Sequence, residues 1–351
     1  MKRGYRLLYF IPLLLILYLL LDQYVFYTKA VFPPATVFSG KSIYNPYAQL
    51  DTSDAVVANF HAHAKAWGGL TNGKGSAQDI WRRYDSMGYA FHGVSQYFNI
   101  DTFNHRAINY VPVYEHGINL RKTHQLVMGA TSVAWKDFIF PQTLDNKQFI
   151  INKIAEDPHA LIVLNHPNML NGYQVDEMKK LYNYDLIEIL NPQAQSLPHW
   201  DAALSSGRAV FGIANDDVHN VLKNSLISRF YTIVYGSASE AEGLYNALKL
   251  GSHISVWAPK VAADDLAAKK RKIESAKKLL LSVKVLNETV HIQFSKAIDT
   301  IQLIGNNGKC LRMERMQNAI SYQFTPSDTY MRVEFVVEDG SRFYMNPFFR
   351  Y

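Results

Sequence analysis

The chain has 351 residues, of which 48% are hydrophobic and 19% are charged. This balance excludes a disordered chain and indicates a well-filled globular core. The single cysteine, Cys310, excludes an intramolecular disulfide, while the formal net charge of +6 raises the question of a nucleic-acid partner.

The amino terminus carries basic residues within positions 1–6 and then an apolar run, Leu7–Leu21. Basic residues ahead of an apolar segment place that end in the cytoplasm, so we expect the rest of the chain to lie outside the membrane, periplasmic or extracellular. A spanning helix needs about 20 apolar residues, which the run approaches only with Val25–Tyr27 included. We expect residues 1–30 to form a single-pass signal anchor, with a cleaved signal peptide as the alternative.

Residues 31–52 read as a tether, stiffened by Pro33 and Pro34, that spaces the following domains from the membrane. At about 100–200 residues per domain, the remaining length predicts two domains. The first is expected at 53–260 and the second at 280–351, joined by a helical linker at 261–279.

Five short apolar runs adjoin residues that can hold a metal. They are Val56–Phe60 before His61 and His63, Val111–Tyr114 before Glu115, Gln125–Met128 after His124, Leu161–Asn165 before His166, and Ala209–Ile213 before Asp217 and His219. In α/β barrels such residues converge because the carboxyl ends of the strands meet on one face. Imidazole and carboxylate together suit zinc, iron or manganese better than calcium, so a divalent metal site is predicted here.

Helical patterns over 79–87, 147–156 and 174–181 alternate with these runs, as a barrel requires. A cluster of basic residues lies in the linker, where acids come first and bases later, as in a solvated helix. No basic run interleaved with aromatic residues appears, so no nucleic-acid partner is expected.

After the linker the pattern changes to short β-rich segments, at 281–285, 289–294, 300–304, 321–324, 330–337 and 341–345. Turns separate them at Asn306–Gly308 and Glu338–Gly340. We predict a small antiparallel β-sandwich with a supporting or binding role.

The collinear motifs resemble the PHP family, the metal-dependent phosphoesterase domain shared by histidinol phosphatases and the exonuclease parts of some DNA polymerases. The matching segments are 59–63, 111–115, 122–125, 164–167, 185–190 and 215–219, followed by an Ala-Leu-x-x-Gly ending at 247–251. The resemblance spans roughly residues 53–257 and implies an irregular (β/α)7 barrel. It also implies that the β-sandwich follows this barrel, as in some exported relatives.

The resemblance also implies two divalent metal ions, zinc, manganese or iron. The first would take His61, His63, Glu115 and Asp217, and the second would share Glu115 and add His124 and His166. A carboxylate between two cations can bridge them, which makes the same arrangement chemically reasonable without the family.

Two departures concern a third metal. Where the family has Thr-Asp-His, this chain has Ser95, Gln96 and Tyr97, and a further family histidine falls on Gly68–Gly69. Only His219 remains of the three expected ligands, so we predict two metals, with Tyr97 in the place of the lost histidine but not bonded to a metal.

The expected activity is hydrolysis of a phosphate ester by metal-activated water, with Glu115, Asp217 and Arg229 as catalytic residues. Candidate substrate contacts are Lys65, Asn168 and Glu188, although Arg229 could equally be a surface residue and Glu188 could sit on a solvated edge. The substrate would be a phosphorylated small molecule. The alternative is a catalytically degenerate, metal-stabilised module that binds an envelope glycan or protein.

Overall fold

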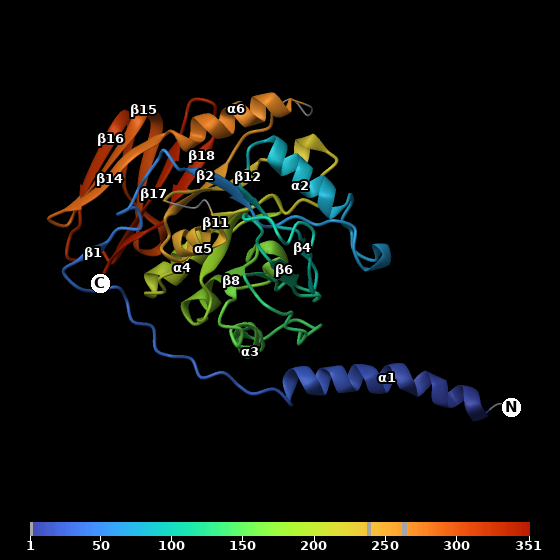
Figure 1. Cartoon of the computed structure of the whole chain (residues 1–351). Helices are drawn as coiled ribbons and strands as arrows, with labels where there is room; N and C mark the ends of the chain where they lie inside the picture. Colours follow the sequence, from blue (N-terminus) through green and yellow to red (C-terminus); the bar gives the residue numbers. More distant parts are fainter. Residues whose placement is uncertain (1–2, 237–239, 262–264) are drawn as a thin grey trace.

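The computed structural model describes residues 3–236, 240–261 and 265–351, with side chains from residue 10 onward, and shows a mixed α/β body from which one helix projects (Figure 1). That helix is α1 (Arg3–Tyr24). Among the residues so described, none of the helices is both long and apolar enough to traverse a bilayer. The spanning helix expected within residues 1–30 therefore gains no support from the structure.

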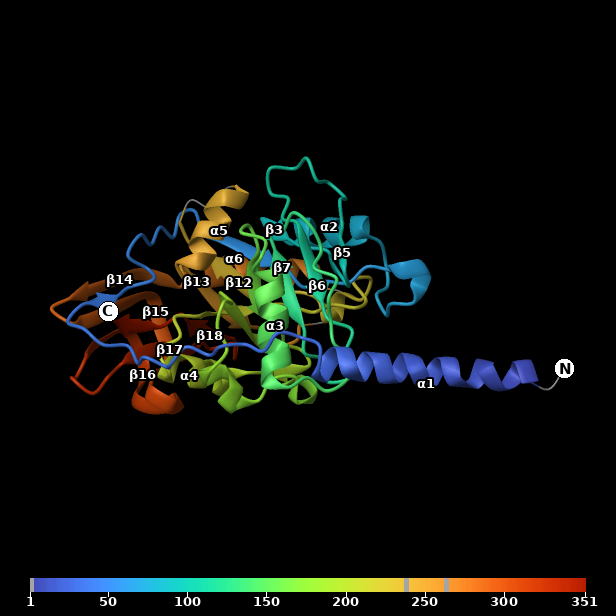
Figure 2. The ribbon, with the colours of Figure 1, turned by 90° about the horizontal axis from the view of Figure 1, so that it is seen from below.

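The carboxyl end of α1 is fixed to the body by its polar side chains. Gln23 donates from Nε2 to the carbonyl oxygen of Phe140 at 3.0 Å and accepts from the Phe140 N–H at 2.9 Å. Asn146 donates to the Gln23 carbonyl oxygen, and Asp22 pairs with Lys136. Figure 2 shows the rest of α1 extending away from the body, as Figure 1 does.

The expected tether lies against the body for much of its length instead of acting as a free spacer. Phe38 stacks on Phe349 with ring centroids 4.4 Å apart, and the Tyr182 hydroxyl donates to the Val31 carbonyl oxygen. Strand β1 (Ile43–Tyr44) pairs antiparallel with β19 (Phe348–Arg350) near the carboxyl terminus. Aromatic packing and this short ladder are features that a proline-rich sequence does not reveal.

The larger sheet has eleven strands and joins the first half of the chain to its last third. Its main path is β1, β19, β17 (Tyr330–Val336), β18 (Arg342–Met345), β13 (His253–Trp257), β12 (Phe230–Val234), β2 (Val56–Asn59) and β3 (Phe91–His92). The remaining members are β14 (Leu280–Leu286), β15 (Thr289–Gly305) and β16 (Lys309–Gln323), which meet the path where β15 pairs with β17.

The second sheet has six strands. Its path is β10 (Ala194–Gln195), β9 (Leu186–Asn191), β8 (Leu161–Leu164), β7 (Gln125–Met128) and β6 (Val113–His116), and β11 (Phe211–Ala214) pairs with β9. Strands β8, β9 and β11 are parallel, whereas β6, β7 and β8 alternate in direction. A separate ribbon holds β4 (Ser95–Gln96) and β5 (Asn99–Ile100).

The strands of the predicted irregular barrel fall into two sheets, whose edges are connected by side chains and isolated bridges. Between β11 and β12, the Ala214 N–H donates to Thr232 Oγ1 at 3.1 Å, and the same hydroxyl donates to the Ala214 carbonyl oxygen at 3.0 Å. On the other side, an isolated bridge joins Tyr97 to Glu115. Because β3 is only two residues long, it offers little backbone for a ladder that would close a barrel.

The expected β-sandwich is also hydrogen-bonded to the first domain, since β18 pairs antiparallel with β13 from Ile254 to Trp257. Segments predicted as two strands form the single long strand β15, whose register shifts between Gln293 and Ile298. Its partner β16 was not predicted over most of its length, because nearly all its side chains are exposed and no buried alternation marks it.

Helices cover the sheets close to the predicted positions. These are α2 (Ala77–Ser86), α3 (Leu144–Ile154), α5 (Ala241–Lys249) and α6 (Leu266–Lys277), while the helix expected at 174–181 is the 3₁₀ segment Val175–Lys179. A further helix, α4 (Leu197–Ser205), was not predicted. Capping boxes begin α2 at Ser76 and α3 at Thr143. Residues 262–264 of the expected linker lie outside the described residues.

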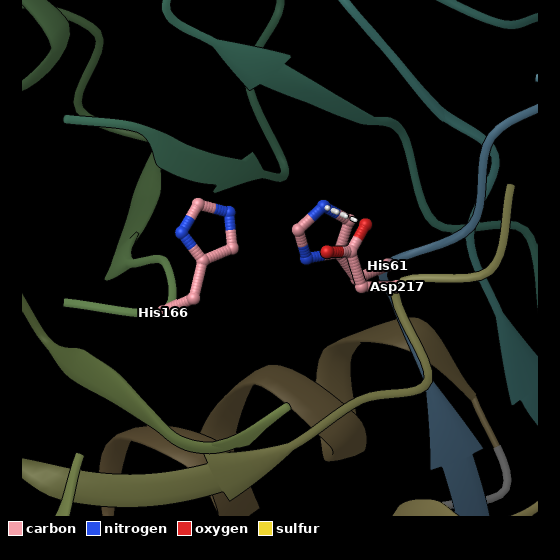
Figure 3. A group of neighbouring side chains, drawn as sticks. All are labelled: His61, His166 and Asp217. Atoms are coloured by element: carbon pink, nitrogen blue, oxygen red, sulfur yellow. Dashed lines mark ion pairs between the residues drawn. The ribbon is translucent and has the colours of Figure 1, made fainter. Parts of the chain in front are cut away.

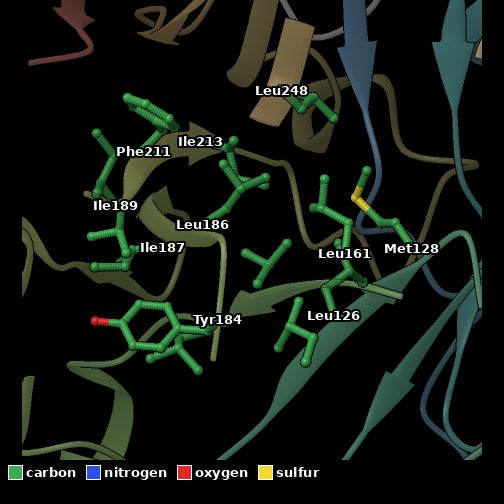
Figure 4. Packing of buried hydrophobic residues seen from close by; sticks show 14 of the residues in the cluster. Leu126, Met128, Leu161, Tyr184, Leu186, Ile187, Ile189, Phe211, Ile213 and Leu248 are labelled. Atoms are coloured by element: carbon green, nitrogen blue, oxygen red, sulfur yellow. The ribbon is translucent and has the colours of Figure 1, made fainter. Parts of the chain in front are cut away.

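Apolar side chains from β7, β8, β9, β11 and α5 fill the space behind the second sheet. Figure 4 shows Leu126, Leu161, Leu186, Ile213 and Leu248 in this cluster, all buried. Such a packed layer fixes the strands, and therefore fixes the positions of the polar residues at their ends.

Candidate metal centre

The strand ends bring the predicted ligand residues to one edge of the two sheets. His61 and His63 follow β2, Glu115 lies in β6, and His124 immediately precedes β7. Because β6 and β7 are antiparallel, the end of β6 and the start of β7 meet at the same edge. His166 follows β8, while Asp217 and His219 follow β11.

The first group of side chains joins two histidines to two carboxylates. His61 Nε2 lies 3.3 Å from Glu115 Oε1 and 3.2 Å from Asp217 Oδ1. His63 Nε2 lies 3.2 Å from Glu115 Oε2 and 3.4 Å from Asp217 Oδ1. Figure 3 shows His61 and Asp217 directed toward each other, with the ring of His166 nearby. The side chains of this first group, His61, His63, Glu115 and Asp217, are all buried.

The second group shares Glu115 with the first. His124 Nδ1 lies 2.9 Å from Glu115 Oε1, and His166 Nε2 lies 3.4 Å from the same oxygen. Glu115, His124 and His166 can each direct one ligand atom to a common point. Glu115 is therefore placed to contribute to two adjacent metal positions.

Unpartnered buried atoms show that the first group suits a cation. Within the described part of the chain, His61 Nε2, His63 Nε2, Glu115 Oε2 and Asp217 Oδ1 are buried and have no hydrogen-bond partner. Leaving one such atom unpaired costs about 1–3 kcal/mol, so their convergence calls for a ligand. A divalent ion bound by imidazole nitrogen and carboxylate oxygen satisfies all four.

Electrostatics in the cluster keep the carboxylates ionised. Burial raises the pKa of Glu115, but His124 and His61 lower it more, so the pKa lies well below the usual range. For Asp217, too, burial raises the pKa and His61 and His63 lower it more. Metal ligands must be deprotonated, and these carboxylates meet that condition.

Glu188 is fully buried and contacts two of the ligand residues, His61 and His166, instead of lying at an exposed surface. Its Oε1 lies 3.0 Å from His61 Nδ1 and accepts from Asn215 Nδ2 at 3.0 Å. Its Oε2 accepts from the His166 N–H at 3.0 Å and from Asn191 Nδ2 at 2.9 Å. A proton on His61 Nδ1 leaves Nε2 available for a metal, as carboxylate–histidine–metal arrangements require.

Two of the ligand candidates have an unusual backbone conformation. His166 has φ of 30° and Asp217 has φ of 42°, in the left-handed region that side chains with a Cβ rarely occupy. Such strain persists where the surrounding structure fixes it, and it concentrates at functional sites.

Gly117 has a specific steric role beside His124. A Cβ at Gly117, where φ is 126°, would lie 2.5 Å from His124 Cδ2. Any other residue would therefore displace the imidazole. The role of this glycine could not be predicted from the sequence, since it depends on a contact with a side chain seven positions away.

The position of the lost third-metal histidine holds an aromatic ring. Tyr97 stacks on His63 with centroids 4.9 Å apart, and His219 stacks on the same imidazole at 4.4 Å. His219 Nδ1 lies 3.5 Å from Asp217 Oδ1, so His219 can join Asp217 and His63 around an ion. Burial, with Glu115 and Asp217 nearby, raises the pKa of the Tyr97 hydroxyl.

The other predicted contacts form no hydrogen bond or ion pair with these ligand residues in the part of the chain that the structure describes. The Arg229 guanidinium sits over the Phe230 ring at 5.5 Å, and it forms no ion pair within the described residues. Its backbone N–H donates to Asp216, a buried carboxylate that also accepts from Ser228. Lys65 and Asn168 are exposed, and Asn168 donates to the Gln195 carbonyl oxygen at 3.3 Å.

Buried asparagines hold the strand ends together and were also missed. Asn59 accepts from the Asp216 N–H at 2.7 Å, Asn215 accepts from the Phe60 N–H at 2.8 Å, and Asn165 donates to Glu115 Oε1 at 3.0 Å. All three asparagines stand at a strand end or directly beside a strand end or a ligand residue in the sequence. That position is the one signal that could have indicated them.

Comparison with models of known protein families gives no match, and comparison with curated proteins gives none. Two chains of solved structures match. One is described as a two-domain protein containing a predicted PHP-like metal-dependent phosphoesterase from Bacteroides vulgatus. It is 12% identical, with a TM-score of 0.42, and the match covers 91% of this chain and 100% of that one. The case for metal chemistry here therefore rests on the residues of this chain.

Proposed function

We propose that this protein is a metal-dependent hydrolase of phosphate esters. The observation that carries the proposal is Glu115, a buried carboxylate shared by two groups of metal-ligating side chains. His61, His63 and Asp217 would complete one metal position. His124 and His166 would complete the other.

Each protein group has a role that follows from its contacts. When bound, divalent cations would supply a water with a pKa lowered to about 7 and would offset charge that develops on phosphorus. Glu115 would hold the two positions at a fixed separation. Glu188 holds the Nδ1 proton of His61, so that Nε2 faces the metal position.

Turnover on phosphate esters tests the proposal. After chelation and dialysis, the protein would be assayed on a phosphomonoester, p-nitrophenyl phosphate, and on a phosphodiester, bis(p-nitrophenyl) phosphate, with zinc, manganese or no metal. We expect hydrolysis only with added metal and a loss of at least about 100-fold in Glu115→Gln. The matched control Glu177→Gln changes a carboxylate that pairs with Lys147 outside the site and should retain activity.

One observation favours a second candidate, a metal-stabilised binding module. The Tyr97 ring stacks on His63 where the resemblance expects a third-metal ligand. Two bound metals with no turnover on either ester would support this candidate and contradict the hydrolase.

The relation of the chain to a membrane is a separate proposal. Apolar side chains of α1 such as Phe10, Leu14 and Leu17 are at least half exposed, and basic residues precede them in the sequence. We propose that α1 holds the body at the outer face of the cytoplasmic membrane. Protease added to intact spheroplasts should digest the body; digestion only after lysis would contradict this topology, and a soluble protein beginning near Val31 would indicate a cleaved signal.

A further inference from the structure

A groove of about 920 Å³ opens beside the candidate metal centre and has a mainly apolar lining. Its apolar residues include Trp67, Leu70, Ile118, Leu120, Trp135 and Ile139. Leu70 is 91% exposed, and Ile118, Leu120 and Trp135 are each more than 60% exposed. Apolar side chains gathered in this way at an open groove mark a surface that binds an apolar partner.

The groove adjoins both halves of the metal centre through two of the residues that line it. Tyr97 lines it and stacks on His63 of the first ligand group. Gly117 also lines it and adjoins the His124 ring of the second group. The Trp67 indole N–H donates to the Tyr97 carbonyl oxygen at 2.7 Å, which holds Trp67 against Tyr97 in the wall of the groove. A ligand with one end at the metal centre can therefore extend along the groove.

The groove also adjoins the base of α1. Its wall includes Asp137 and Ile139, and the segment 136–141 is the one that holds Asp22 and Gln23. The groove therefore opens close to where the apolar helix leaves the body. Exposed tryptophans at its rim suit the boundary between lipid and water, where Trp is enriched.

The charged groups fit a phosphate at the inner end. Lys122 lines the groove two residues before His124 and forms no ion pair among the residues described. The Asp137 carboxylate is already used, since it accepts from the N–H groups of Ile118 and Phe138. Lys122 is thus the cation available to an anionic headgroup.

From these contacts we infer that the substrate is a membrane lipid phosphate, with its phosphate at the metal centre and its hydrocarbon chain in the groove. This inference rests on the proposed function and deepens it. The same groove has no use for a small polar phosphate such as a sugar phosphate.

The experiment measures binding of methyl-, butyl- and octylphosphonate to the zinc-loaded full-length chain by titration calorimetry. Each buried methylene strengthens binding about fourfold, so burial of only four predicts about a 200-fold gain from methyl to octyl. The double variant Leu70→Ser with Ile118→Ser should flatten this gain. Leu281→Ser with Leu286→Ser changes two exposed leucines on β14, away from the groove, and should keep the gain.

The outcomes separate this inference from the proposed function, because phosphonates are not hydrolysed. Octylphosphonate binding no tighter than methylphosphonate, an unchanged gain in the groove variant, or no binding by the whole series would overturn the groove inference. A steep gain that the groove variant removes, in a protein without turnover on any ester, would support the groove and contradict only the hydrolase proposal.

Discussion

Replacing Glu188 with glutamine removes the carboxylate that orients the metal ligands without removing a ligand. The side chain is fully buried and has four hydrogen-bond partners, at His61, His166, Asn191 and Asn215. Glutamine keeps one acceptor oxygen and turns an amide N–H₂ toward groups that are themselves donors. His61 then loses the acceptor that holds its proton on Nδ1, and its Nε2 is no longer fixed as the metal-facing nitrogen.

The size of the effect follows from two costs. Loss of such an outer carboxylate lowers metal affinity about 10- to 100-fold, which corresponds to about 1.4–2.7 kcal/mol. The unpaired buried donors cost a further 1–3 kcal/mol or so of folding stability, independent of metal. Zinc affinity should therefore fall in Glu188→Gln, and the melting temperature should fall even in excess chelator.

The assay is competitive zinc titration against a chromophoric chelator, paired with thermal unfolding in chelator. The matched control is Glu334→Gln. It alters a carboxylate on β17 that pairs with Arg332 and contacts none of the ligand residues among those described. It should leave zinc affinity unchanged. If Glu188→Gln binds zinc as tightly as the unaltered protein, Glu188 does not orient His61 in the way described.

Three further predictions concern the metal site and the body. Asp217→Asn should empty one metal position while the far-ultraviolet circular dichroism spectrum is retained; full metal content by elemental analysis would contradict it. Arg332→Met should cost roughly 3–5 kcal/mol in denaturant unfolding, because it leaves Asp201, which Arg332 contacts at 2.7 and 2.8 Å, buried without its cation; a loss under 1 kcal/mol would refute this. Burial lowers the pKa of His253 from 6.5 to about 4, so the stability tied to its neutral form is present above pH 6.5 and falls by roughly 3 kcal/mol as pH drops to 4. His253→Leu should flatten this slope because it removes the titrating group. The Gly212 carbonyl oxygen keeps a donor in this variant, since Ser255 also donates to it.

The ligand residues could be proposed from sequence because each stands next to a short apolar strand. His61, Glu115, His166 and Asp217 adjoin strands whose burial the apolar runs indicate, and parallel or hairpin topology then brings them together. The role of Glu188 could not be decided in this way. It lies inside a strand buried on both faces, where alternation gives no direction, and only its contact with His61 shows its role.

The closure of the sheets was beyond the sequence for a different reason. Bonds between Thr232 and Ala214 replace a strand ladder, and they join residues eighteen positions apart through a side chain. Likewise, β18 pairs with β13 across the boundary at which the pattern changes from α/β to β. Local periodicity carries no information on either contact.

The most direct test of the two-metal centre is anomalous scattering from crystals of the zinc-loaded protein. We expect two adjacent peaks, one bonded to His61, His63 and Asp217 and the other to His124 and His166, with Glu115 between them. A single peak, peaks away from these residues, or a third ion bonded to Tyr97 would contradict it.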